Sequence, residues 1–407
     1  MTVMRIKGRG QRRRLSSPTC VITARSWWFC IAILLCVSMV LFNVGFYNTG
    51  GGSSSSSSSM DEIINTSTVS SKANDNVSSK SSSNEKAINK DNVATRSSGN
   101  KQFKISNLKN TNEHILRILN DAKITSINEE KAKQLPTWED ITSMYGDKPV
   151  IHGLETCEHY RNMVKPEDRS IGPAGLFNTG TNLLFTLLKS NCEIDGNILW
   201  QAPWGKHEMA SSRLKNVQSG AEDINQTTFF PLMMIKDPFW WMNSLCRHSY
   251  HAISWYSEYD KEHCPNLIRG NITDRDETVP VRLWTGTTHD SLLDVWNHYY
   301  GEEWEVERAK FPHLSIRYED LLFHGREVSK IACECVGGSA TTDFQYVKES
   351  AKGSEGSHKG SNDLIKALLQ YGDPARRLSG FTDRDLRYAR NNKATVDLMK
   401  KYVYSEF

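Results

Sequence analysis

Net charge is scarce in this sequence. The 407 residues include 50 Lys and Arg and 47 Asp and Glu, so the formal net charge is only +3. The basic excess lies at the N-terminus, and composition therefore gives little support to nucleic-acid binding. Apolar residues are also rare across much of the first hundred residues, which contribute almost nothing to a core. The remaining length suits one or two folded domains.

Acidic residues are missing before Ser26, although basic residues are frequent there. The basic residues are Arg5, Lys7, Arg9, Arg12, Arg13, Arg14 and Arg25. An apolar run from Trp27 to Tyr47 follows, and it is long enough to cross a bilayer, at roughly 20 residues. No small-x-small cleavage site follows the run, which disfavours the alternative of a cleaved signal peptide. We therefore predict a cytoplasmic tail (1–25) and a signal anchor (26–47) that places the rest of the chain in the lumen.

A low-complexity segment follows the predicted membrane span. It contains three consecutive glycines and a serine tract from Ser53 to Ser59, with few apolar residues. Such a segment cannot bury enough surface to offset its ordering entropy, so we predict a disordered stem over 48–135. An amphipathic patch at 115–119 is a candidate stem helix. The folded domain is expected to span 136–407.

The cysteines lack the spacing of a zinc site. Cys333-x-Cys335 has no second pair at ligand spacing. Six cysteines follow the predicted span: Cys157, Cys192, Cys246, Cys264, Cys333 and Cys335. An even number in an oxidising compartment predicts disulfides, whose pairing the sequence leaves open. Four Asn-x-Ser/Thr sequons fit lumenal exposure: Asn65, Asn76, Asn225 and Asn271.

The stretch 171–188 almost spells a phosphate loop but lacks its lysine. An apolar run over 173–177 predicts a strand, Asn178-Thr179-Gly180 a tight turn, and leucines from Leu183 to Leu188 a helix. The N-terminus of such a helix can bind an anion, and Gly180 allows close approach to the backbone. Thr181 and Asn182 replace Lys and Ser/Thr, which disfavours magnesium-dependent hydrolysis of nucleotides. The alternative is a turn in which glycine merely relieves crowding.

Two further predicted strands end at residues that can carry chemistry. Strand 197–201 leads to Lys206-His207-Glu208, where His207 can act as general base and Lys206 can neutralise developing charge. Strand 229–235 leads to Lys236 and to a helix with Asp237 as cap and Pro238 at its first position. Lys236 and the helical Ser244 can then reach one phosphate. Ligands of open α/β sheets bind beyond the carboxyl ends of strands, which favours these roles over solvated loops.

The remaining segments are less specific. We predict a helix over 291–300, a strand over 313–318 and a final helix over 382–402. The segment 250–281 has no clear period and is expected to surround the substrate. The basic loop 352–359 either closes over a phosphate or is a surface loop. Two Asp-x-Asp pairs, at 274–276 and 383–385, invite a glycosyltransferase interpretation, but neither follows an apolar strand and we treat both as coincidental.

Taken together, these sites resemble the sulfotransferases that use 3′-phosphoadenosine 5′-phosphosulfate. Asn178-Thr179-Gly180-Thr181-Asn182 resembles their 5′-phosphosulfate loop, and Lys236 with Ser244 resembles their 3′-phosphate site. Tyr318, within Ile316–Leu322, is similar to the aromatic residue that lies near the nucleotide. Lys206-His207 falls where cytosolic members have Lys-x-His, and Lys352-Gly353 resembles the basic-Gly loop over the 3′-phosphate. The resemblance covers about residues 170–360 as a set.

The resemblance implies a P-loop-type three-layer α/β fold with a central, mainly parallel sheet flanked by helices. It implies a single-pass type II Golgi membrane protein that transfers a sulfo group to a carbohydrate or glycoconjugate, without a metal. Asn178 stands where the family usually has Lys or Arg, and Lys236 stands where it has Arg. Activity therefore depends on Lys206 supplying the missing charge. The alternatives are a lumenal glycosyltransferase and a non-catalytic sulfotransferase-like protein. The acceptor and the oligomeric state stay open.

Overall fold

The computed structural model describes residues 102–107, 113–270, 277–305, 310–349 and 363–407. All of them belong to the second of two units of the chain, Val93–Phe407. The predicted tail, membrane span and stem up to residue 101 lie outside the described residues. No helix within the described ranges combines the length and apolar character that a membrane crossing requires.

A five-stranded sheet forms the centre of the fold. Its order is β3-β11-β7-β4-β6, with β3 antiparallel to β11 and the other neighbours parallel. The strands are β3 (Ile151–His152), β4 (Ser170–Gly175), β6 (Asn197–Ile198), β7 (Phe229–Ile235) and β11 (Leu314–Arg317). Every residue of β4, β7 and β11 is buried, as expected for a parallel sheet covered on both faces. The predicted α/β class with a mainly parallel central sheet is confirmed.

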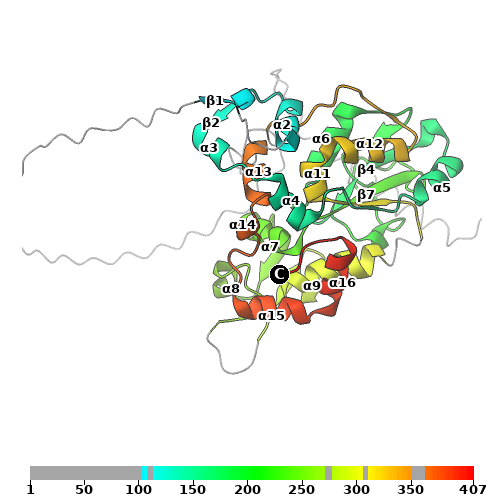
Figure 1. Ribbon diagram of the computed structural model, residues 1–407. Helices are drawn as coiled ribbons and strands as arrows, with labels where there is room; N and C mark the ends of the chain where they lie inside the picture. The colour runs from blue at the N-terminus through cyan, green and yellow to red at the C-terminus, as the bar shows by residue number, and fades with distance from the viewer. Residues whose placement is uncertain (1–101, 108–112, 271–276, 306–309, 350–362) are drawn as a thin grey trace, which may run out of the picture. The chain divides into compact units, whose positions relative to one another are not determined.

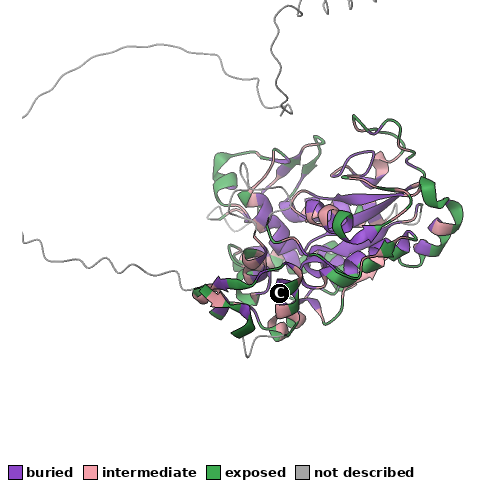
Figure 2. Ribbon diagram, turned by 90° about the horizontal axis from the view of Figure 1, so that it is seen from above, coloured by how far each residue is buried: buried purple, intermediate pink, exposed green. Residues whose placement is uncertain are grey.

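Helices flank this sheet. Those on one side are α6 (Thr181–Asn191) and α12 (Gly325–Cys335), which pack against each other; on the other side lie α7 (Pro238–Arg247), α9 (Leu292–Asn297) and α16 (Lys393–Lys401) (Figure 1). The burial colours show the strands as the buried centre between the partly exposed helices (Figure 2). Because β4, β7 and β11 are parallel, their carboxyl ends meet at one edge of the sheet.

The remaining elements are short. They are β1 (Gln102–Lys104), η1 (Ile105–Asn107), α2 (Glu113–Asp121), β2 (Ser126–Asn128), α3 (Glu129–Lys133), α4 (Trp138–Tyr145), α5 (Thr156–Met163), η2 (Pro166–Asp168), β5 (Cys192–Glu193), η3 (Ala210–Ser212), β8 (Ile253–Trp255), α8 (Glu258–Glu262), β9 (Val281–Leu283), β10 (Thr288–His289), η4 (His298–Trp304), α11 (Tyr318–Phe323), β12 (Ser339–Ala340), α13 (Leu364–Tyr371), α14 (Pro374–Arg377) and α15 (Asp383–Asn391).

The folded unit extends further toward the N-terminus than the sequence predicted. Ile115, Leu119 and Ile127 are buried in the same core as the central sheet. Their side chains belong to α2 and β2, within the segment assigned to the stem. The amphipathic patch at 115–119 is therefore the buried face of a domain helix. The sequence on either side is polar, so the few apolar residues that pack α2 against the core were not recognised as part of the domain.

Several predicted elements have different bounds. The predicted strand 173–177 is β4, which ends at Gly175, and the predicted strand 197–201 is only the two-residue β6. The predicted final helix is two helices, α15 and α16, because Asn392 leaves the helical conformation and caps α16. Helix 291–300 is α9 followed by the π-helical η4. The segment 250–281 contributes β8 and α8, and β8 pairs with β9 in a small antiparallel sheet that includes β10.

The six cysteines of the described domain form three disulfides. Cys157–Cys335 joins α5 to the end of α12, with 4.8 Å between the Cα atoms. Cys192–Cys333 joins β5 to α12, and Cys246–Cys264 joins α7 to the chain after α8. The prediction that these cysteines are oxidised in pairs is confirmed.

Candidate functional site

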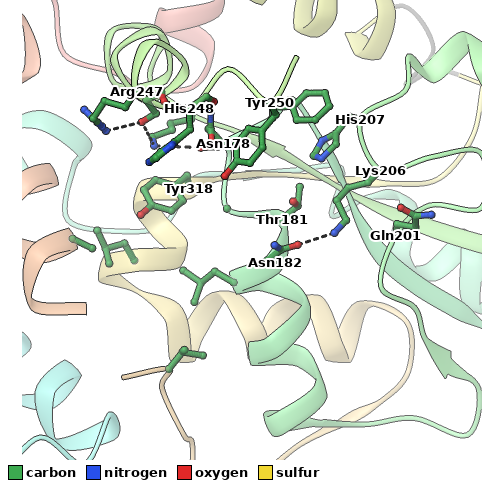
Figure 3. A pocket seen from close by; sticks show the side chains of 18 of the residues that line it. Asn178, Thr181, Asn182, Gln201, Lys206, His207, Arg247, His248, Tyr250 and Tyr318 are labelled. Atoms are coloured by element: carbon green, nitrogen blue, oxygen red, sulfur yellow. Dashed lines mark hydrogen bonds between the residues drawn. The ribbon is translucent and has the colours of Figure 1, made fainter. Parts of the chain in front are cut away.

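A cavity of about 770 Å³ opens at the carboxyl edge of the central sheet. Its walls include the segments that follow β4, β6, β7 and β11 (Figure 3). The predicted site residues that line it are Asn178, Gly180, Thr181, Asn182, Lys206, His207, Lys236, Ser244 and Tyr318. The structure thus brings together residues that lie as far apart in sequence as Asn178 and Tyr318. Lys352 and Gly353 lie outside the described residues.

The turn between β4 and α6 adopts an unusual backbone conformation. Asn178 has φ +64° and Gly180 φ +84°, both in the left-handed region that favours glycine and tolerates asparagine. Gly180 caps α6, and a Cβ atom there would collide with the Tyr318 ring. Glycine is therefore required by the packing of Tyr318 as well as by the turn. The first N–H groups of α6 have no intrahelical partners and carry the positive end of the helix dipole.

Two side chains of this turn donate hydrogen bonds to backbone carbonyls of the protein. Thr179 is buried, and its hydroxyl donates to the Leu176 carbonyl at 2.6 Å, so its side chain does not line the cavity. Asn178 lines the cavity, but its amide donates to the carbonyl of His248 at 2.8 Å. Asn178 therefore holds the C-terminal end of α7. The sulfotransferases that this turn resembles have a cation at the position of Asn178.

The side chain of Lys206 lies beside the first turn of α6. Its side chain is buried, and Nζ donates to Asn182 Oδ1 at 2.7 Å and lies 3.1 Å from the centre of the Trp200 ring (Figure 3). The hydrogen bond and the aromatic face both hold the ammonium group beside the first turn of the helix. A positive charge is thus present next to the turn after β4, although Asn178 provides none.

His207 follows on the same segment. Its Nδ1 lies 2.7 Å from the Gly175 carbonyl oxygen, and the ring stacks on Phe177 with 3.9 Å between ring centres. A carbonyl oxygen only accepts, so the proton is on Nδ1 and Nε2 is the basic nitrogen. This arrangement fixes the imidazole in the form that a general base requires.

Lys236 directly follows β7 and is only 2% exposed. Its Nζ donates to Ser244 Oγ at 3.0 Å, to Tyr371 Oη at 2.7 Å and to the Asn178 carbonyl at 3.3 Å. The predicted pair of Lys236 and Ser244 is thus in direct contact, next to the turn after β4. The rings of Tyr318 and Tyr371 each lie 4.4 Å from Nζ.

The two tyrosines respond to this ammonium group differently. Burial raises the pKa of Tyr318 well above its usual range. Burial alone would also raise the pKa of Tyr371, but the charge of Lys236 and its hydrogen bond outweigh burial and lower it. The Tyr371 hydroxyl is therefore more acidic than that of an ordinary tyrosine.

Two members of this group were not assigned a role from the sequence. Tyr371 ends α13, far from the other site residues in sequence and without a motif of its own. Arg247 lines the cavity and donates to Ser244 Oγ at 3.3 Å. Its position three residues after Ser244 on α7 places both side chains on one helix face, which is a signal that sequence alone contains.

Of the two Asp-x-Asp pairs, the structure describes Asp383 and Asp385, and neither residue lines the cavity. Asp385 is fully buried, and its carboxylate accepts from the backbone N–H groups of Leu267 and Ile268. It therefore has a structural role, while Asp274 and Asp276 lie outside the described residues. In the described part of the chain, no group of three or more His, Cys, Asp or Glu side chains is arranged to hold a metal ion.

Comparisons with known proteins do not identify a function, so a function must be inferred from the residues of the site. No protein-family model matches the chain, and neither the curated proteins nor the solved structures gave a match.

Proposed function

We propose that this protein is a sulfotransferase that moves a sulfo group from 3′-phosphoadenosine 5′-phosphosulfate to a hydroxyl of a carbohydrate or glycoconjugate. The observation that carries the proposal is Lys236, a buried ammonium group whose hydrogen bonds go to a carbonyl and two hydroxyls. A desolvated cation with neutral acceptors is strongly attracted to an anion. The neighbouring N-terminus of α6 and Lys206 favour a second anionic group.

The donor is bound at two ends of the cavity. Backbone N–H groups of Gly180, Thr181 and Asn182, with Lys206, hold the 5′-phosphosulfate. Lys236 and Ser244 hold the 3′-phosphate, and Arg247 adds a second cation at that end. The fold is of the P-loop type in this proposal, because the turn after β4 binds the phosphosulfate through its backbone.

His207 starts the transfer. Its Nε2 takes the proton of the acceptor hydroxyl as the hydroxyl oxygen forms a bond to sulfur. The bond from sulfur to the 5′-phosphate oxygen breaks in line, and adenosine 3′,5′-bisphosphate leaves with both electrons. Lys206 stabilises the charge on the departing oxygen. Positioning and electrostatics supply most of the rate, as in phosphoryl transfer, and no metal is required.

Calorimetry on the full-length chain with adenosine 3′,5′-bisphosphate tests the donor site. We expect saturable binding that does not require a divalent metal. Transfer of labelled sulfate to a panel of saccharides then tests turnover. Absence of bisphosphate binding would indicate the non-catalytic alternative. Manganese-dependent binding of a nucleoside-diphosphate sugar, without binding of the bisphosphate, would indicate a glycosyltransferase.

We further propose that the domain faces the Golgi lumen from a single-pass type II anchor. Among the sequons, Asn225 lies in the described region and is exposed, while its Oδ1 accepts from the Thr227 N–H and hydroxyl. Asn225→Gln should therefore increase the mobility of the cell-expressed protein in gel electrophoresis by one glycan. A mobility that neither this change nor deglycosylation alters would argue against lumenal exposure of this surface.

A further inference from the structure

Three aromatic side chains, one of which contacts His207, lie together in the wall of the cavity. Phe177 stacks on the His207 ring, and its ring centre lies 5.2 Å from Trp284 and 6.0 Å from Tyr250. All of them line the cavity, and none is fully buried. We call Phe177, Tyr250 and Trp284 the aromatic group. Its three rings lie in the wall of the cavity that His207 also lines.

The backbone that carries this group is held in place. Tyr250 and its neighbour His251 have φ values of +52° and +58°, a left-handed pair that is unfavourable for residues other than glycine. The Trp284 N–H donates to the Ala252 carbonyl at 2.9 Å, which ties the end of β9 to this turn. Strained conformations persist where surrounding structure fixes them, and they occur often at ligand sites.

The polar side chains that line the cavity include neutral amides and a carboxylate besides the cations Lys206 and Arg247. Gln201, Gln218 and Glu208 line the same cavity, and Gln201 lies beside Lys206 in Figure 3. Glu208 and Gln218 both lie where a Cβ atom on Gly205 would point. Amide groups donate and accept, and a carboxylate accepts, so this set suits a ligand with several hydroxyls. A uronate or a sulfated sugar would instead bring a negative charge close to Glu208.

We propose that the aromatic group is the acceptor subsite and that it binds an uncharged sugar ring, with Trp284 as the residue that determines this preference. The inference rests on the proposed function and names its substrate class. The C–H bonds on one face of a pyranose carry partial positive charge and match the negative face of an indole ring. The hydroxyls at the rim of the sugar pair with the amides, and one of them reaches His207. A tyrosine side chain has a single hydroxyl and would leave these polar groups unpaired.

The test compares three acceptors with the full-length protein and labelled donor: a neutral N-acetyllactosamine oligosaccharide, a desulfated glucuronate-containing polysaccharide, and a tyrosine-containing peptide. We expect transfer to the neutral oligosaccharide. Trp284→Ala should raise KM for this acceptor by about tenfold, with a smaller change in kcat. Trp284→Phe should recover part of the loss. Tyr259→Ala, which removes an exposed aromatic ring that does not line the cavity, serves as the matched control.

Affinity for adenosine 3′,5′-bisphosphate should be unchanged in Trp284→Ala, which also shows that the variant is folded. Preferred transfer to the polysaccharide or the peptide, or an unchanged KM in Trp284→Ala, would overturn the inference. Saturation-transfer NMR with the neutral oligosaccharide examines the subsite without donor. Saccharide binding that Trp284→Ala abolishes, in a protein that binds no bisphosphate, would overturn the proposed donor and leave the sugar subsite standing.

Discussion

At the scale of single residues, the surroundings of Lys236 indicate a role in function rather than in stability. A buried ammonium group loses its hydration, and the effective cost is several kcal/mol. Its partners are hydroxyls and a carbonyl, which compensate only in part, and Ser244 Oγ also donates to the Trp240 carbonyl at 2.8 Å. A lysine that served stability alone would be a poor choice at this position. The cost is understandable if the residue binds an anion.

Lys236→Met therefore has opposite expected effects on binding and on stability. Affinity for adenosine 3′,5′-bisphosphate should fall by roughly tenfold to a hundredfold, because hydrogen bonds to charged groups contribute about 1.5–3 kcal/mol. The midpoint of thermal unfolding should stay the same or rise. Calorimetry and circular dichroism measure the two effects. Lys330→Met, which changes an exposed lysine on α12, is the control. A clear loss of stability with unchanged affinity would assign Lys236 a structural role.

His207→Ala tests the base. Removal of a general base lowers kcat by about 10²- to 10⁴-fold. Affinity for the bisphosphate should change little, since His207 bonds to Gly175 and faces the acceptor side. The neighbouring Glu208→Gln keeps the shape of the segment and removes a charge. If Glu208→Gln abolished transfer and His207→Ala did not, the role of base would pass to Glu208.

At the scale of elements, the turn after β4 and the end of α7 support each other through Asn178. Its left-handed backbone explains an asparagine there, and its side-chain amide reaches the carbonyl of His248. Asn178→Ala loses both features and should lower the free energy of unfolding by about 2 kcal/mol. Asn178→Gly keeps the backbone conformation and should lose less.

Urea unfolding of the two Asn178 variants, read by fluorescence, gives the comparison. Equal stability of wild type and Asn178→Ala, together with reduced bisphosphate affinity, would contradict the capping role and make the side chain an anion ligand.

Elements were predictable where one segment contained the whole signal. β7 and α7 follow from an apolar run, an aspartate cap and a proline at the first helical position, and both occur where the sequence placed them. β6 has only two residues because its length is set by pairing with β4, which sequence does not reveal. The break at Asn392 depends on a polar side chain that fits either a helix or a cap. Local sequence cannot decide such cases.

The same distinction applies to the site. Lys206, His207, Lys236 and Ser244 were found because each follows a strand of a parallel sheet, and the topology then brings them to one cavity. Tyr371 could not be found in this way. It joins the site because α13 packs against α11, a long-range contact between elements that are distant in sequence.

At the scale of the whole molecule, a buried network joins the Lys236 end of the cavity to the C-terminal segment. Glu319 accepts from the Asp237 N–H at 3.2 Å and from the Tyr404 hydroxyl at 3.1 Å. Arg377 pairs with Asp237 at 2.8 Å and donates to the Ser405 carbonyl. Burial, followed by the nearby charge of Asp237, raises the pKa of Glu319 from 4.5 to about 7. The folded state of this carboxyl therefore binds its proton more tightly than the unfolded chain does.

The sign of the resulting pH dependence follows from proton counting. Between about pH 4.5 and 7 the folded protein keeps the Glu319 proton and the unfolded chain has released it, so this residue lowers the free energy of unfolding as the pH rises through that window. His324 has the opposite effect, because burial lowers its pKa to about 4 and the unfolded chain binds the proton first.

The difference in free energy of unfolding between wild type and Glu319→Gln isolates the effect of Glu319. Relative to wild type, Glu319→Gln should gain stability steadily from pH 5 to 7.5 in urea unfolding, whereas His324→Gln should lose stability relative to wild type over the rise from about pH 4 to 6.5. A Glu319→Gln difference that does not change with pH would mean that Glu319 is ionised in the folded protein throughout, and that its charge is balanced within the network.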